Sequence, residues 1–185
     1  MNLFTICATL SLEVKDMIHI YMKEQYVARK ERIIIKDEAG KDIYLITGKW
    51  GNVGDGLYLY KIDGTLVAEV KQTKLSLMPK FDIYLSGKKV CSVSKYPGIH
   101  NPYFRVSRIH WIISGDFANH HYKILHLTKT VMTMDKVYLA SGDFYALSIK
   151  REQDLPLCVC LAVILDHWVI PRAPAKDGPL NLPAY

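Results

Sequence analysis

The sequence predicts a mostly β fold, in which about twelve antiparallel strands form a closed barrel around one hydrophobic C-terminal α-helix. Two observations predict this architecture. Residues 18 to 150 form a series of short runs that alternate apolar and polar side chains, separated by glycine turns, which is typical of β-hairpins. Leu155–Leu165 is apolar without interruption, and a helix that is apolar on every side must be surrounded by protein. The predicted strands can form a wall around this helix, and closing them into a barrel removes exposed strand edges.

Glycine turns mark the hairpins. Gly40, Gly64 and Gly87 each lie between two alternating runs and are 24 and 23 residues apart, so the repeating element is about two strands long. The expected strands are Ile18–Tyr26, Arg32–Asp37, Asp42–Lys49, Gly56–Lys61, Leu66–Gln72, Lys80–Leu85, Lys88–Ser94, Tyr103–Ile109, Trp111–Gly115, His120–His126, Thr130–Lys136 and Asp143–Lys150.

Alternation also predicts which face of a strand is buried. Phe81 and Ile83 share one face of their strand, whereas Asp82 and Tyr84 share the other, which is the period-two pattern of a half-buried strand. The helix is expected at about 155–168, with Asp154 as its N-cap. It is too short to cross a bilayer, because a spanning helix needs ~20 apolar residues.

The chain fits a single barrel domain over residues 18–170. Residues 1–17 are an N-terminal appendage that the pattern does not place, and Met22 is a candidate for an alternative start. Residues 171–185 form a proline-rich extended tail. The N-terminal residues lack the basic segment and cleavage pattern of a signal peptide. The four cysteines do not form a disulfide framework, which favours a reducing cytoplasm.

Positive charge is concentrated in the middle of the chain. The net charge is +6, and the segment from Lys71 to Arg108 holds eight basic residues against one acid, Asp82. Such an excess attracts phosphates, anionic lipid or an acidic protein, although a solvated outer barrel face has the same composition. The candidate anion-binding residues are Lys71, Lys74, Lys80, Lys88, Lys89, Arg105 and Arg108.

Several units, taken in order along the chain, resemble the LURP-one-related family. That family shares its fold with the tubby C-terminal domain and the phospholipid scramblases, so the resemblance implies a twelve-stranded barrel around a hydrophobic helix. The units that carry the resemblance are Gly40–Tyr44, Leu57–Gly64, Ala68–Gln72, Met78–Tyr84, Ile113–Phe117, His121–Ile124 and Leu161–Asp166.

The resemblance implies less about activity than about fold. Tubby-like domains bind phosphoinositide head groups through basic residues on the barrel exterior, and scramblases act at membranes. The segment Ser148–Asp154 lacks the acidic cluster of a calcium site, which argues against calcium-triggered lipid movement here.

The chain offers little material for catalysis. His120 and His126 share one face of the expected strand while His121 lies on the other, so the three do not converge on a metal. Cys158 and Cys160 lie about 200° apart on a helix and are expected in the core. Neither a nucleophile elbow nor a phosphate-binding loop is present, and the glycine-rich stretch from Gly48 to Gly56 opens no helix. No catalytic residue, metal or cofactor is therefore predicted.

The leading hypothesis is a non-enzymatic barrel that binds phospholipid head groups or an acidic protein through the basic segment, in the cytoplasm or peripherally at the membrane. A small-ligand carrier or an enzyme that uses the barrel mouth is the alternative, although the central helix would fill the lumen. Binding of nucleic acid ranks third and is not expected. Tyr96, Tyr103 and Phe104 interleave with the basic residues, but they belong to no recognised module.

Overall fold

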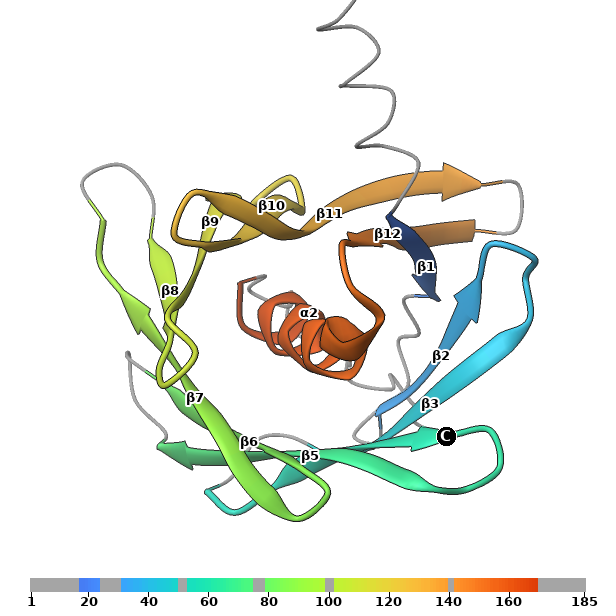
Figure 1. The fold of residues 1–185 in the computed structure, drawn as a ribbon, viewed down its shortest axis with the longest axis horizontal. Helices are drawn as coiled ribbons and strands as arrows, with labels where there is room; N and C mark the ends of the chain where they lie inside the picture. The colour runs from blue at the N-terminus through green and yellow to red at the C-terminus, as the bar shows by residue number, and fades with distance from the viewer. Residues whose placement is uncertain are drawn as a thin grey trace, which may run out of the picture.

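The computed structural model describes residues 17–23, 31–49, 53–74, 79–98, 102–139 and 142–169. In this part of the chain, twelve antiparallel strands close into one barrel that surrounds a helix (Figure 1). Each strand pairs with its neighbours in sequence, and β1 pairs with β12 to complete the ring. The predicted fold is confirmed. The strands are β1 Ile18–Lys23, β2 Glu31–Asp37, β3 Asp42–Gly48, β4 Gly56–Lys61, β5 Leu66–Lys74, β6 Lys80–Leu85, β7 Lys88–Tyr96, β8 Tyr103–Val106, β9 Trp111–Asp116, β10 His121–His126, β11 Lys129–Leu139 and β12 Gly142–Ile149.

The helix lies inside the barrel because its residues 155–165 are apolar on every side. After β12 the chain forms a short 3-10 helix, η1 (Glu152–Asp154), and then the α-helix α2 (Leu155–Val169). Every side chain of α2 from Leu157 to Leu165 is at most 5% exposed. The strands supply the other half of this core through their inward side chains, such as Phe81 and Ile83 of β6.

The structure corrects some expected strand ends. β8 ends at Val106 and not at Ile109, because Arg108 and His110 adopt φ angles of 70° and 57° and form a turn. β10 begins one residue later than expected, since His120 has a φ of 54°.

Asp154, the expected N-cap of the helix, lies in η1, where its carboxylate accepts a hydrogen bond from Arg151 Nε at 2.7 Å. The expected strand residues 24–26, the N-terminal appendage up to residue 16 and the tail from 171 lie outside the described residues.

The antiparallel order gives the barrel two different ends. Because successive strands alternate in direction, the connections that leave β2, β4, β6, β8, β10 and β12 all lie at the same end. We call this end the turn rim, formed by residues 37–41, 61–66, 86–88, 107–110, 127–129 and 150–154. The connections that leave the odd-numbered strands lie at the opposite end. Among the described residues, no helix has both the length and the hydropathy needed to cross a membrane.

Candidate anion-binding surfaces

The structure places the seven predicted basic residues in different parts of the barrel. Lys74, Lys80 and Arg105 lie in one lateral row across β5, β6 and β8, with Ser94 of β7 between Lys80 and Arg105. All three are exposed. Neighbouring strands are ~4.8 Å apart, so the row is about 14 Å long. We call these three basic residues the wall row.

Lys71 is close to the wall row but is locally neutralised. Its Nζ lies 3.1 Å from Glu69 Oε1 and 5.1 Å from the centre of the Tyr84 ring. The hydrogen bond to Glu69 raises the pKa of Lys71. Its charge is therefore shared with a carboxylate of the same strand, which weakens it as a site for an external anion.

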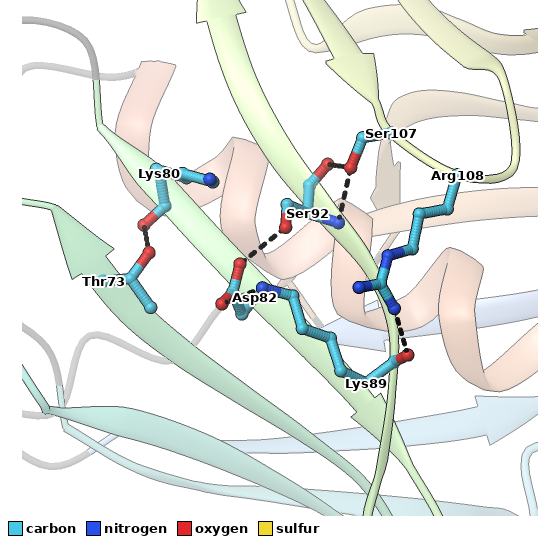
Figure 2. Close-up of polar contacts among 7 residues, drawn as sticks. All are labelled: Thr73, Lys80, Asp82, Lys89, Ser92, Ser107 and Arg108. Atoms are coloured by element: carbon cyan, nitrogen blue, oxygen red, sulfur yellow. Dashed lines mark hydrogen bonds and ion pairs between the residues drawn. The ribbon is translucent and has the colours of Figure 1, made fainter.

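Lys89 belongs to a polar network on β6 and β7, seen in Figure 2. Asp82 is only 7% exposed, and its carboxylate accepts hydrogen bonds from Lys89 Nζ and, at 2.6 Å, from Ser92 Oγ. Burial raises the pKa of Asp82, but the two hydrogen bonds outweigh it and hold the pKa below its ordinary value of 3.8. Arg108 donates to the carbonyl oxygen of Lys89 at 3.0 Å (Figure 2). The charge of Lys89 is thus matched inside the protein.

Basic side chains are distributed around the whole turn rim. Lys88 and Arg108 come from the predicted set, and four further lysines lie in or beside other connections of the rim. All of them are exposed, and in the described part of the chain none of them forms an ion pair. The six residues, one for each connection, are Lys41, Lys61, Lys88, Arg108, Lys129 and Lys150. We call them the rim cations.

Sequence reasoning missed four of the rim cations because it searched for charge excess within one contiguous segment. Lys41 and Lys150 are more than a hundred residues apart in the chain and meet at one end of the barrel only after the strands pair. The signal that could have found them is a basic residue in or beside every second turn. The rim also carries the acids Asp37, Glu38, Asp63, Glu152 and Asp154, which are fewer than the rim cations.

The histidines considered as metal ligands lie in different environments. His120 is half-buried near α2, with Nδ1 3.8 Å from Asp166 Oδ1 and its ring 5.0 Å from that of Tyr145. His121 is exposed and contacts Asp135, and His126 is exposed on the rim side of β10. Among the described residues, no group of three His, Cys, Asp or Glu side chains could hold a metal ion.

The cysteines of α2 are core residues. Cys158 and Cys160 are 0% and 2% exposed. Burial raises the pKa of both thiols, that of Cys160 to about 12. These thiols are therefore protonated at neutral pH and behave as small hydrophobic groups, since a reactive cysteine needs the thiolate.

The glycine-rich stretch has a packing role at both of its ends. A Cβ atom on Gly48 would lie 2.2 Å from the Gly56 carbonyl oxygen, and one on Gly56 would lie 2.4 Å from that of Val70. These glycines allow β3, β4 and β5 to approach closely. Residues 50–52 of this stretch lie outside the described residues.

Among the described residues, the side chains of α2 are packed against the barrel wall, since those from Leu157 to Leu165 are at most 5% exposed. A small cavity lies between the helix and the wall, and its lining is apolar. It lacks the convergent polar groups with which a binding pocket orients a small molecule. The lining residues are Ile46, Leu57, Leu59, Val70, Cys160 and Val163.

The aromatic residues that suggested nucleic-acid contact are split between core and surface. Phe104 is 1% exposed and packs edge-on against Phe117, with ring centres 5.4 Å apart. Tyr96 and Tyr103 are exposed and stack on each other at 5.5 Å. Phe104 cannot therefore stack on a base.

Comparison with known proteins finds similarity in both sequence and structure. The protein YxjI of Bacillus subtilis (strain 168), which is uncharacterized, is 29% identical over 150 residues, covering 81% of this chain and 93% of YxjI. The X-ray structure of the Arabidopsis thaliana protein AT5G01750 has the same fold, with a TM-score of 0.59 and 14% identity over 82% of this chain and 90% of that chain. The sequence profile of the LURP-one-related family matches residues 18–166, and the chain belongs to this family.

Proposed function

We propose that the protein is a non-enzymatic binding module that docks its turn rim on an anionic phospholipid surface. The observation that carries the proposal is the set of rim cations, in which each of six connections contributes an exposed basic side chain without an ion-pair partner among the described residues. A planar anionic surface can contact all six rim cations at once, whereas a ligand in a single pocket cannot.

The energetics favour the rim over the wall row. A lysine or arginine near an anionic membrane contributes about 1 kcal/mol, so the number of cations that reach one plane decides the affinity. The wall row offers three cations on a curved surface, and the rim offers six at one end. The attraction is screened within a Debye length of ~8 Å at physiological salt, which favours cations at exposed turn tips.

A carrier or an enzyme at the barrel mouth is the alternative. The packing of α2 supports the binding module over this alternative, because Leu161 and Ile164 fill the lumen with 0% exposure. The proposal places the protein in the cytoplasm, where the inner leaflet is rich in anionic lipid. The three described cysteines are free thiols, which fits that reducing compartment.

The test compares two triple variants that lower the net charge by the same amount. The rim variant carries Lys61→Glu, Lys88→Glu and Lys129→Glu. The wall variant carries Lys74→Glu, Lys80→Glu and Arg105→Glu. Sedimentation with vesicles of phosphatidylcholine and phosphatidylserine, and with phosphatidylcholine alone, measures partitioning at low and high salt.

We expect the wild-type protein to bind the anionic vesicles in a salt-sensitive manner and to ignore the neutral ones. The rim variant should lose at least 100-fold in partitioning, because removing three cations forfeits about 3 kcal/mol. The wall variant should lose much less. Equal binding to neutral vesicles, or a larger loss in the wall variant, would contradict the proposal.

A further inference from the structure

Two hairpin tips on the turn rim expose large aliphatic side chains. Ile62, in the turn between β4 and β5, is 56% exposed, and Leu127, in the turn between β10 and β11, is 81% exposed. Leu66, at the start of β5, is 48% exposed beside the first of these tips. Figure 1 shows β5 and the pair β10 and β11 on opposite sides of the barrel. The rim therefore presents two separate apolar points.

Leu127 also adopts an unfavourable backbone conformation. Its φ is 56°, in the left-handed region, where glycine and asparagine are tolerated and a branched side chain is strained. A strained residue is normally compensated by packing, yet this side chain projects into solvent. Because its side chain is exposed, Leu127 does not stabilise the folded barrel by packing, which indicates a role outside the fold.

Each apolar tip is accompanied by cations. Lys61 directly precedes Ile62, and Lys129 follows Leu127 by two residues. Both lysines are exposed and lack an ion-pair partner in the described residues. An aliphatic side chain at the tip with a lysine behind it matches the layering of a bilayer surface, where hydrocarbon lies below anionic head groups.

We propose that Ile62 and Leu127 insert into the bilayer from opposite sides of the turn rim, so that the barrel stands with its axis along the membrane normal. This inference rests on the proposed function and adds the orientation and the apolar anchors. A bilayer fits better than a protein partner, because a protein interface is built around one contiguous buried core and these two tips lie apart across the barrel.

The opposite end of the barrel supplies a matched control. Val53, between β3 and β4, is an aliphatic residue that is 63% exposed at that end. It resembles the rim tips in exposure but differs in surroundings, because Lys49 in the same connection pairs with Asp55 at 3.3 Å. A barrel that stands on the turn rim holds Val53 away from the bilayer.

The first experiment measures depth with tryptophan probes. The variants Ile62→Trp, Leu127→Trp and Val53→Trp are mixed with anionic vesicles that contain brominated phosphatidylcholine, which quenches tryptophan buried in the acyl region. Fluorescence of Ile62→Trp and Leu127→Trp should be quenched and blue-shifted, and Val53→Trp should behave as the wild-type background. Quenching of Val53→Trp alone, or of none of the three while vesicle binding persists, would overturn the proposed orientation.

The second experiment separates insertion from folding. Leu127→Asn suits the left-handed conformation, so the melting temperature should be unchanged or raised by about 2 °C. Partitioning to anionic vesicles should nevertheless fall by about tenfold, because a leucine is lost from the apolar phase. Val53→Asn should leave partitioning unchanged.

The outcomes distinguish this inference from the proposed function. If Leu127→Asn binds like the wild type while the rim variant does not bind, electrostatic docking stands and insertion is wrong. If the rim variant binds like the wild type, docking through the turn rim is wrong, and the inference about insertion falls with it.

Discussion

A carboxylate that is withdrawn from water needs donors to replace its hydration, and Asp82 obtains them from Lys89 and Ser92. The Lys89 side chain lies across β6 and β7 and covers the carboxylate, which is why this outward position is only 7% exposed. This partly buried pair is costly to break, because the charge-assisted hydrogen bonds of a carboxylate that is only 7% exposed are lost. The network therefore holds the Lys89 side chain against β6 and β7.

Replacing Asp82 by asparagine should therefore destabilise the protein. We expect Asp82→Asn to lower the free energy of unfolding by about 2 kcal/mol at pH 7, since hydrogen bonds to a charged group are lost. The pKa of Asp82 is lowered in the folded state, so its stabilisation is present above the ordinary pKa of 3.8 and is lost as the pH falls through the folded value. The difference in the free energy of unfolding between variant and wild type should disappear below that pH.

Denaturant titrations at pH 7 and at acidic pH measure this difference. Asp42→Asn is the control, because Asp42 pairs with Lys36 on the surface and their side chains are 42% and 37% exposed. The control should change stability by less than about 1 kcal/mol. An Asp82→Asn variant as stable as the control at pH 7 would show that the network is not a stabilising element.

The helix α2 fills the interior of the barrel, which the strands alone cannot fill. An apolar barrel of this size without a helix would enclose a void, and a void forfeits the dispersion contacts of the atoms that line it. Leu161, Val163 and Ile164 point to different sides of the helix and are all at most 2% exposed, so the wall contacts α2 around its circumference. The helix therefore acts as the core of the whole ring.

Truncation of a helix side chain tests this role. Leu161→Ala should lower the free energy of unfolding by about 3 kcal/mol, because a fully buried leucine leaves a cavity that the ring cannot fill by collapse. Leu127→Ala removes the same atoms from a side chain that is 81% exposed and should change stability by less than about 0.5 kcal/mol. Equal effects of the two substitutions on denaturant unfolding would be incompatible with a helix packed inside the barrel.

Local sequence patterns predict the architecture of the barrel but not the distribution of charge on its surface. The alternation around Phe81 and Ile83 and the apolar run Leu155–Leu165 are visible in short windows, so strands, helix and closure could be predicted. The left-handed residues Arg108 and His120 carry no such signal, because non-glycine residues rarely adopt these angles. The rim cations depend on strand pairing, which brings together residues far apart in sequence, such as Lys41 and Lys150.

Barrel closure depends on the first strand, β1. The closing strand β1 spans Ile18–Lys23, and all six of its residues have register partners on β12. His19 Nδ1 and Ser148 Oγ, 2.8 Å apart, form a side-chain hydrogen bond across the same seam. A chain that starts at Met22 lacks four of the six paired residues, including the buried Ile20.

We expect a variant that starts at Met22 to fail to fold, because β2 and β12 would then present open edges and the core would be uncovered along one side. A variant that starts at Met17 keeps every paired residue of β1 and should melt as one cooperative transition. Circular dichroism and size-exclusion chromatography compare the two. A monomeric, cooperatively melting protein from the Met22 start would show that the barrel does not need β1, and that the ring closes by another route.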